Sequence, residues 1–115
     1  MKRHPTASLF DLTQRFFHEY LQHTRGASAH TVRAYRDALK LFFTFVAQQK
    51  RAQVAQLSLD DIQAETVLAF LEHVESRRGN SAATRNCRLV SLRSFAQHLL
   101  RHVVTRAGQY SRILA

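Results

Sequence analysis

Proline and glycine are almost absent from the interior of this chain. Its single proline, Pro5, precedes every periodic segment, and only three glycines occur in 115 residues. Proline and glycine are the residues that most often interrupt a helix, so nothing in the middle of the chain prevents long helices. Apolar residues also recur at three- and four-residue spacing, which is the pattern of an amphipathic helix. The sequence therefore predicts an all-α fold.

Four segments carry an apolar stripe of this kind. They are residues 9–24, residues 28–50, a third segment that stops at Gly79 after a turn at 57–62, and residues 81–103. Ser28 is the expected N-cap of the second helix, and Ser81 or Asn80 that of the fourth. Because the connections are short, we expect a compact antiparallel bundle of four main helices around one core.

The two ends of the chain lack the stripe. We expect residues 1–8 to be a flexible N-terminus, residues 9–103 to form the one domain, and residues 104–115 to be an exposed tail or linker. No apolar run approaches membrane-spanning length, and no signal-peptide core follows the N-terminus. The only cysteine, Cys87, cannot form an internal disulfide. These features predict a cytoplasmic protein.

Charge is divided into blocks along the sequence. Residues 1–51 hold nine basic and three acidic side chains, residues 52–76 hold five acidic and no basic ones, and residues 77–115 hold eight basic and no acidic ones. The net charge of +9 favours a polyanionic partner, and nucleic acid is the first candidate. The alternative is a protein of high isoelectric point whose basic residues scatter over its surface.

The second predicted helix carries a basic ridge beside its apolar stripe. Arg33, Arg36 and Lys40 form the ridge. It can contact phosphates along a groove, or it can be an ordinary solvated face in which Asp37 pairs with Arg33 at four-residue spacing. Both interpretations stay open on the sequence alone.

The fourth predicted helix begins with two polar turns, because its apolar stripe starts only at Leu89. Arg85 points toward the core, and it would be buried unpaired unless this end of the helix projects beyond the bundle. A helix N-terminus favours phosphate, and Arg and Asn side chains can contact guanine and adenine edges. The alternative is ordinary capping polarity with arginines that reach solvent.

Residue groups that support catalysis or metal binding are missing from the sequence. His98 and His102 are four residues apart but have no third ligand nearby, so we expect them to be solvated or part of the basic face. Cys87 has no His–Asn constellation, and Asp60-Asp61 suits the start of a helix better than catalysis. We therefore expect no metal, no cofactor and no enzymatic activity of this chain alone.

Two stretches resemble a known pair of motifs. Residues 28–39, SAHTVRAYRDAL, followed by Phe42, resemble the S-x-x-T-x-x-x-Y-x-x-x-L-x-x-F signature of the N-terminal core-binding domain of tyrosine recombinases, the Xer-like and phage-integrase-like family. Residues 81–95, SAATRNCRLVSLRSF, resemble its second signature, S-x-x-T-x-N-R-x-L-x-x-L-R-x-F. The order and separation of the two motifs fit as well, and the resemblance covers residues 9–103.

The resemblance implies a SAM-like helical domain that forms one half of a clamp around DNA. The second and fourth helices would then approach the major groove of a recombination site in double-stranded DNA, with other recombinase protomers as further partners and no membrane or small-molecule substrate. The residues that would face DNA are His30, Thr31, Arg33, Arg36, Lys40, Ser81, Thr84, Arg85, Asn86, Arg88 and Arg93. Cys87 departs from the pattern, because the family often has arginine there.

The same resemblance implies that strand exchange needs a longer C-terminal domain. The family's catalytic arginines, lysine, histidine and nucleophilic tyrosine lie in that domain, and neither Tyr35 nor Tyr110 matches the nucleophile. We therefore expect this chain to bind DNA without cutting it, as part of a recombinase or integrase of a mobile element or chromosome. Residues 104–115 would begin the linker to the catalytic domain.

Other functions remain as alternatives. The main one is a basic helical protein-interaction module that docks an acidic partner, which would bind protein tightly and show no salt-dependent DNA binding. An independent helix-turn-helix repressor is disfavoured, because no compact two-helix unit is apparent. A stand-alone enzyme is the least favoured.

Overall fold

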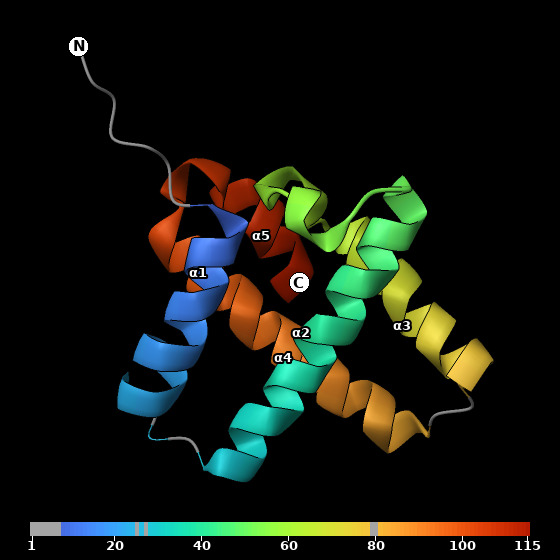
Figure 1. The fold of residues 1–115 in the computed structure, drawn as a ribbon, viewed down its shortest axis with the longest axis horizontal. Helices are drawn as coiled ribbons and strands as arrows, with labels where there is room; N and C mark the ends of the chain where they lie inside the picture. The colour runs from blue at the N-terminus through green and yellow to red at the C-terminus, as the bar shows by residue number, and fades with distance from the viewer. Residues whose placement is uncertain (1–7, 25, 27, 79–80) are drawn as a thin grey trace.

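The fold is all-α, as predicted. The computed structural model describes residues 8–24, 26, 28–78 and 81–115, and this part of the chain contains no strand (Figure 1). Its α-helices are α1 (Leu9–Arg15), α2 (Ala29–Lys50), α3 (Ala64–Arg78), α4 (Ala82–His102) and α5 (Ala107–Leu114). A π-helix, η1 (Phe16–Thr24), continues α1, and the 3-10 turns are η2 (Val54–Gln56), η3 (Leu59–Asp61) and η4 (Val104–Arg106).

The long helices α2 and α4 form the centre of the fold. They cross each other, with α1 and η1 at one side of the crossing and α3 at the other (Figure 1). The α1–η1, α2, α3 and α4 segments lie where the apolar stripes predict helices. The third begins at Ala64 because Asp60-Asp61 belongs to the separate turn η3 rather than to the helix. The predicted boundary residues Gly79 and Asn80 lie outside the described residues.

Serine side chains start three of the helices. Ser28 and Ser81 are N-caps as predicted, and Ser8 forms a capping box with Asp11 at the start of α1. Such caps satisfy backbone N–H groups that have no partner inside the helix. Residues 1–7 of the predicted flexible N-terminus lie outside the described part, but Ser8 is the N-cap of α1.

Aromatic rings fill the core between the helices. Phe16 of η1 packs edge-on against Phe95 of α4 at 5.3 Å between ring centroids, and Phe42 of α2 packs edge-on against Phe70 of α3 at 5.4 Å. These four rings are almost completely buried. Edge-to-face contacts of this kind add to the stabilisation from burial alone, so they fasten α1–η1 and α3 to the two crossing helices.

His98 lies inside this core, and the expectation that it is solvated is wrong. Its side chain is 1% exposed, and its Nε2 lies 2.9 Å from the Leu12 carbonyl oxygen of α1. Burial lowers the pKa of His98 to about 4, with a further lowering from His102 and Arg101, against an opposing effect of the bond to Leu12. A neutral imidazole that donates one hydrogen bond can occupy such a place at low cost. His102 is exposed, although burial also lowers its pKa.

Residues 104–115 are not an exposed tail, so that expectation is wrong. They form η4 and α5, and α5 buries Tyr110 and Ile113 against α3 and α4. Gln109 donates from Nε2 to the carbonyl oxygens of Leu59 and Ile62, at 2.7 and 2.8 Å. One apolar turn is too short to stand out as a periodic stripe, which is why the sequence pattern does not reveal this helix.

A partly buried ion pair joins the end of α2 to η3. Lys50 Nζ lies 2.9 Å from Asp61 Oδ1, and Asp61 Oδ2 accepts from the backbone N–H of Ser58 at 2.8 Å. Partial burial opposes ionisation of Asp61, but the Ser58 and Lys50 bonds outweigh it and lower the pKa of Asp61.

In the described part of the chain, no helix is long and apolar enough to cross a membrane.

Candidate nucleic-acid interface

The candidate interface consists of the N-terminal halves of α2 and α4. Both helices begin along the same edge of the molecule, the lower one in Figure 1, and diverge from their crossing toward that edge. The eleven residues predicted to face DNA all lie on these two helices or at their N-caps. The N-terminal halves of α2 and α4, which carry most of these residues, therefore lie along one edge of the fold.

The two S-x-x-T motifs are helix caps of the same geometry. Ser28 Oγ accepts from the Thr31 backbone N–H at 3.2 Å, and Ser81 Oγ accepts from the Thr84 N–H at 3.2 Å. The paired hydroxyls also touch, at 3.0 Å for Ser28 and Thr31 and at 3.2 Å for Ser81 and Thr84. Each Ser–Thr pair thus fixes where its helix starts. This structural role of Thr31, Ser81 and Thr84 is additional to any contact they make with a ligand.

The basic ridge of α2 is exposed along its length. Arg33, Arg36 and Lys40 all face solvent, and His30 is exposed one turn before them. Among the described residues, Asp37 forms no ion pair with Arg33, so the pairing that would make this an ordinary neutralised face is absent. The Arg36 guanidinium lies over the Phe17 ring at 6.0 Å from its centroid. Its other face remains available to an anion.

Arg85 at the start of α4 has a partner that the sequence reasoning did not anticipate. Its Nε lies 3.3 Å from Glu75 Oε2 of α3, and its side chain is 30% exposed. The expectation of an unpaired arginine on a projecting helix end is therefore corrected, because α3 runs alongside this end of α4. A signal existed: Glu75 and Arg85 are nearly equidistant from the predicted turn at Gly79, so an antiparallel α3–α4 pair brings them together.

Two arginine nitrogens at this end of α4 are buried without a hydrogen bond. Within the described residues, Arg85 Nε and Arg88 Nη1 have no hydrogen-bond partner, although Arg85 Nε lies near Glu75. Buried donors of this kind are costly and are usually satisfied. Asn86 and Cys87 lie between these arginines and are exposed.

Arg93 differs from the other candidates because it is tied to the C-terminal helix. Its Nη2 donates to the carbonyl oxygen of Leu114, at the end of α5. The sequence could not indicate this bond while residues 104–115 were expected to be an exposed tail. Arg93 is nevertheless exposed, so part of its guanidinium still faces solvent.

Comparison with known families decides what kind of domain this is. Residues 14–102 match the family described as "Phage integrase, N-terminal SAM-like domain". The chain belongs to this family. The match covers η1, α2, α3 and α4, the elements that build and support the candidate interface.

Relatives of this phage-integrase SAM-like domain include named recombinases. The chain is 36% identical over 106 residues to y4rD of Sinorhizobium fredii, and 34% identical over 109 residues to y4rC of the same species, both named integrase/recombinase. These alignments cover 92% and 95% of the chain but only 38% and 33% of the relatives. It is also 28% identical to a tyrosine recombinase XerC of Anoxybacillus flavithermus, covering 88% of the chain and 32% of that protein.

The SAM-like domain thus spans about a third of the length of the curated relatives it matches. No solved structure matches the chain. The relatives and the family support a role in recombination, which agrees with the two sequence signatures.

Proposed function

We propose that this SAM-like domain binds the recombination site of a tyrosine recombinase or integrase as the N-terminal half of a DNA clamp. The observation that carries the proposal is the placement of both signature motifs at the capped ends of two crossing helices on one edge of the fold. Each motif supplies exposed cationic or amide side chains next to a helix N-terminus, which is a favourable place for phosphate.

The two helices would have different tasks on the duplex. Arg33, Arg36 and Lys40 form a continuous exposed row, which suits contacts to successive phosphates. The start of α4 carries Asn86 between Arg85 and Arg88, and amide and guanidinium groups recognise adenine and guanine edges in the major groove. We therefore propose that α2 positions the domain on the duplex through phosphate contacts and that α4 recognises the bases.

DNA would also resolve the unsatisfied arginine donors at the start of α4. The Nη1 of Arg88 is buried without a hydrogen bond, and the Arg85 Nε lies beside Glu75 without hydrogen-bond geometry. A phosphate or a guanine edge supplies acceptors in a geometry that matches the guanidinium. In this proposal, both side chains rearrange toward DNA on binding.

The proposal gives this domain no catalytic step. Strand exchange would be carried out by the part of the recombinase that lies outside this chain, and this domain would hold the site and help to assemble protomers on it. Tyr35 and Tyr110 take no part in chemistry here, since both side chains are buried in the core.

The test is duplex binding measured by fluorescence anisotropy over a series of salt concentrations. We expect the logarithm of the affinity to fall linearly with the logarithm of salt concentration. Replacing Arg33, Arg36 and Lys40 by alanine should lower the magnitude of this slope by about 2 to 3, since each lost phosphate contact removes about 0.9. Replacing Arg85 and Arg88 by alanine should weaken binding and reduce discrimination between sequences.

Arg112→Ala is the matched control, because Arg112 is an exposed arginine of α5 outside the proposed interface. It should change the affinity far less than any one substitution of the α2 row. Absence of duplex binding at low salt would refute the proposal. Equal affinity of the Arg85→Ala, Arg88→Ala double variant and the original chain would refute the assigned interface.

A further inference from the structure

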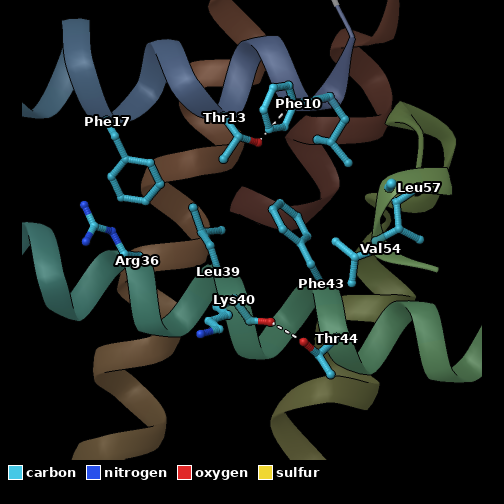
Figure 2. Close-up of a pocket in the computed structure, with 12 residues that line it drawn as sticks. Phe10, Thr13, Phe17, Arg36, Leu39, Lys40, Phe43, Thr44, Val54 and Leu57 are labelled. Carbon is cyan, nitrogen blue, oxygen red and sulfur yellow. Dashed lines mark hydrogen bonds between the residues drawn. The ribbon is translucent and has the colours of Figure 1, made fainter.

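An apolar pocket lies between α1, the start of η1, α2 and the η2 turn. Its volume of about 450 Å³ falls within the range of pockets that hold small molecules, about 300–1,000 Å³. The apolar wall is formed by Phe10 of α1, Phe17 of η1, Leu39 and Phe43 of α2, and Val54 and Leu57 from the η2 side (Figure 2). Phe10 is 68% exposed and Val54 is 49% exposed, so a ligand can reach this wall from solvent.

The hydroxyl groups in the pocket wall are turned away from a ligand. Thr13 Oγ1 donates to the Leu9 carbonyl oxygen at 2.7 Å, and Thr44 Oγ1 donates to the Lys40 carbonyl oxygen at 2.8 Å (Figure 2). Because both hydroxyls bond to their own helices, the threonines present mainly methyl groups to the pocket. The part of a ligand that lies against this wall must therefore be apolar, since a polar group there would lose its bonds to water.

Two cations lie along one side of the pocket. Arg36 and Lys40 are one helical turn apart on α2, and they are the only charged residues among the described residues that line the pocket. The Arg36 guanidinium lies over the Phe17 ring at 6.0 Å from its centroid, which places its charge beside the apolar wall. A ligand that satisfies both parts of the pocket combines an apolar body with an anionic group at one end, because a carboxylate accepts charge-assisted hydrogen bonds from arginine and lysine.

We propose that this pocket binds an alkyl carboxylate and that the bound ligand competes with DNA. The alkyl chain would lie against Phe10, Phe43 and Leu57, and the carboxylate beside Arg36 and Lys40. These two cations also belong to the α2 row proposed to contact phosphates, so ligand and duplex draw on the same charges, and each should weaken binding of the other by the same factor. The competition rests on the proposed function, whereas binding of the carboxylate does not.

The first experiment measures ligand binding in the absence of DNA. A proton–nitrogen NMR titration of the chain with sodium decanoate, kept below its micelle concentration, should shift amide signals around the pocket. Decyltrimethylammonium has the same chain length and the opposite charge and should bind much more weakly, and acetate, which lacks the chain, should not bind. Phe10→Gln removes part of the wall, and Ala55→Trp fills the pocket from an exposed position. Each should weaken decanoate binding by about ten-fold.

Two substitutions within the α2 row separate the ligand site from the DNA site. Arg33 is exposed in the row but does not line the pocket, so Arg33→Gln should weaken duplex binding and change decanoate binding little. Lys40→Gln removes the same charge from a residue that lines the pocket, and it should weaken both. Val104→Gln is the control for both measurements, since Val104 is 74% exposed and belongs to neither site.

The second experiment measures duplex binding by fluorescence anisotropy with and without saturating decanoate. Decanoate should weaken duplex binding and lower the magnitude of the salt slope by about 2, since each of two lost phosphate contacts removes about 0.9. Phe10→Gln should bind the duplex as the original chain does but should lose most of this response to decanoate, because Phe10 belongs to the pocket alone.

Several results would overturn the proposal. They are absence of decanoate binding, equal binding of decyltrimethylammonium, and unchanged decanoate binding by both Phe10→Gln and Ala55→Trp. Binding to phosphatidylglycerol vesicles without binding of monomeric decanoate would assign the pocket to a membrane surface instead. Decanoate binding that disappears as protein concentration rises would mean that another copy of the chain covers the pocket.

Failure of the competition and failure of the proposed function give different results. Decanoate binding that leaves the affinity of a bound duplex unchanged would overturn the competition. If the chain binds no duplex at low salt, the proposed function and the competition both fail, and the NMR titration still decides whether the pocket binds a carboxylate.

Discussion

His98 of α4 donates a hydrogen bond from Nε2 to the carbonyl oxygen of Leu12, 86 residues earlier in the chain, at 2.9 Å. A carbonyl oxygen only accepts, so the bond fixes the imidazole as the tautomer protonated at Nε2. Leu12 O also accepts from the Phe16 N–H, where α1 changes into the π-helix η1. This one carbonyl therefore joins the first helix to the fourth.

The first prediction concerns pH. The pKa of His98 is lowered from 6.5 to about 4, so the unfolded chain binds more protons than the folded one between these values. The free energy of unfolding should therefore be highest above pH 6.5 and fall as the pH drops toward 4. The expected loss between pH 7 and pH 5 is about 2 kcal/mol. Urea denaturation at the two pH values measures it. The His98→Gln variant should lose less free energy of unfolding between pH 7 and pH 5. An equal loss in the variant and the original chain would contradict a buried neutral His98.

The second prediction concerns the hydroxyl of Tyr110. This group is buried without a hydrogen-bond partner among the described residues, and burial raises the pKa of Tyr110. Tyr110→Phe removes an unsatisfied polar atom and keeps the ring, so the free energy of unfolding should stay equal or increase by up to about 1 kcal/mol. Thermal and urea denaturation measure the change. A clear loss of stability would mean that the hydroxyl has a partner in solution.

The third prediction concerns Gln109, which holds α5 against η3. Gln109→Leu keeps the size of the side chain but leaves the carbonyl groups of Leu59 and Ile62 without this donor. We expect a loss of about 1–3 kcal/mol in the free energy of unfolding and faster amide exchange in α5. Ser111→Ala, at an exposed position of the same helix, is the control and should change little.

The fourth prediction concerns the competition between Glu75 and DNA for Arg85. Glu75→Gln removes the carboxylate that lies 3.3 Å from the Arg85 Nε, so duplex affinity should rise a few fold, mostly at low salt. Glu19→Gln is a matched control, since Glu19 pairs with Arg15 at 3.2 Å outside the proposed interface. Equal effects of the two substitutions would show that only net charge matters.

The fifth prediction uses Cys87, the one cysteine of the chain, which is exposed on α4 between Asn86 and Arg88. Modification with a bulky maleimide should reduce duplex affinity strongly, whereas a small methylthio group should reduce it much less, because only the bulky group blocks approach of DNA. Bound DNA should in turn slow the modification. Equal reaction rates with and without DNA would place Cys87 outside the interface.

The sequence predicts the main helices well, because their apolar stripes and caps are local patterns. Apolar stripes and the Ser28 and Ser81 caps are visible within one helix each. The misassigned features depend on distant partners: His98 follows the apolar stripe of α4, but only Leu12 makes its burial acceptable. Likewise, α5 has a single apolar turn, and its order depends on α4 and on the Gln109 bonds to Leu59 and Ile62.

The contacts of α5 have a mechanical consequence for the two crossing helices. Lys50 joins α2 to η3, Gln109 joins η3 to α5, and Arg93 joins α5 to α4. Together with the crossing itself, these three bonds link α2, η3, α5 and α4 in a closed loop, so the angle between α2 and α4 depends on contacts away from their crossing. The angle between α2 and α4 is thus held in part by η3 and α5. A substitution that detaches α5 should therefore change the angle between α2 and α4, and with it the fit of the proposed interface to a duplex, without replacing any residue of those two helices.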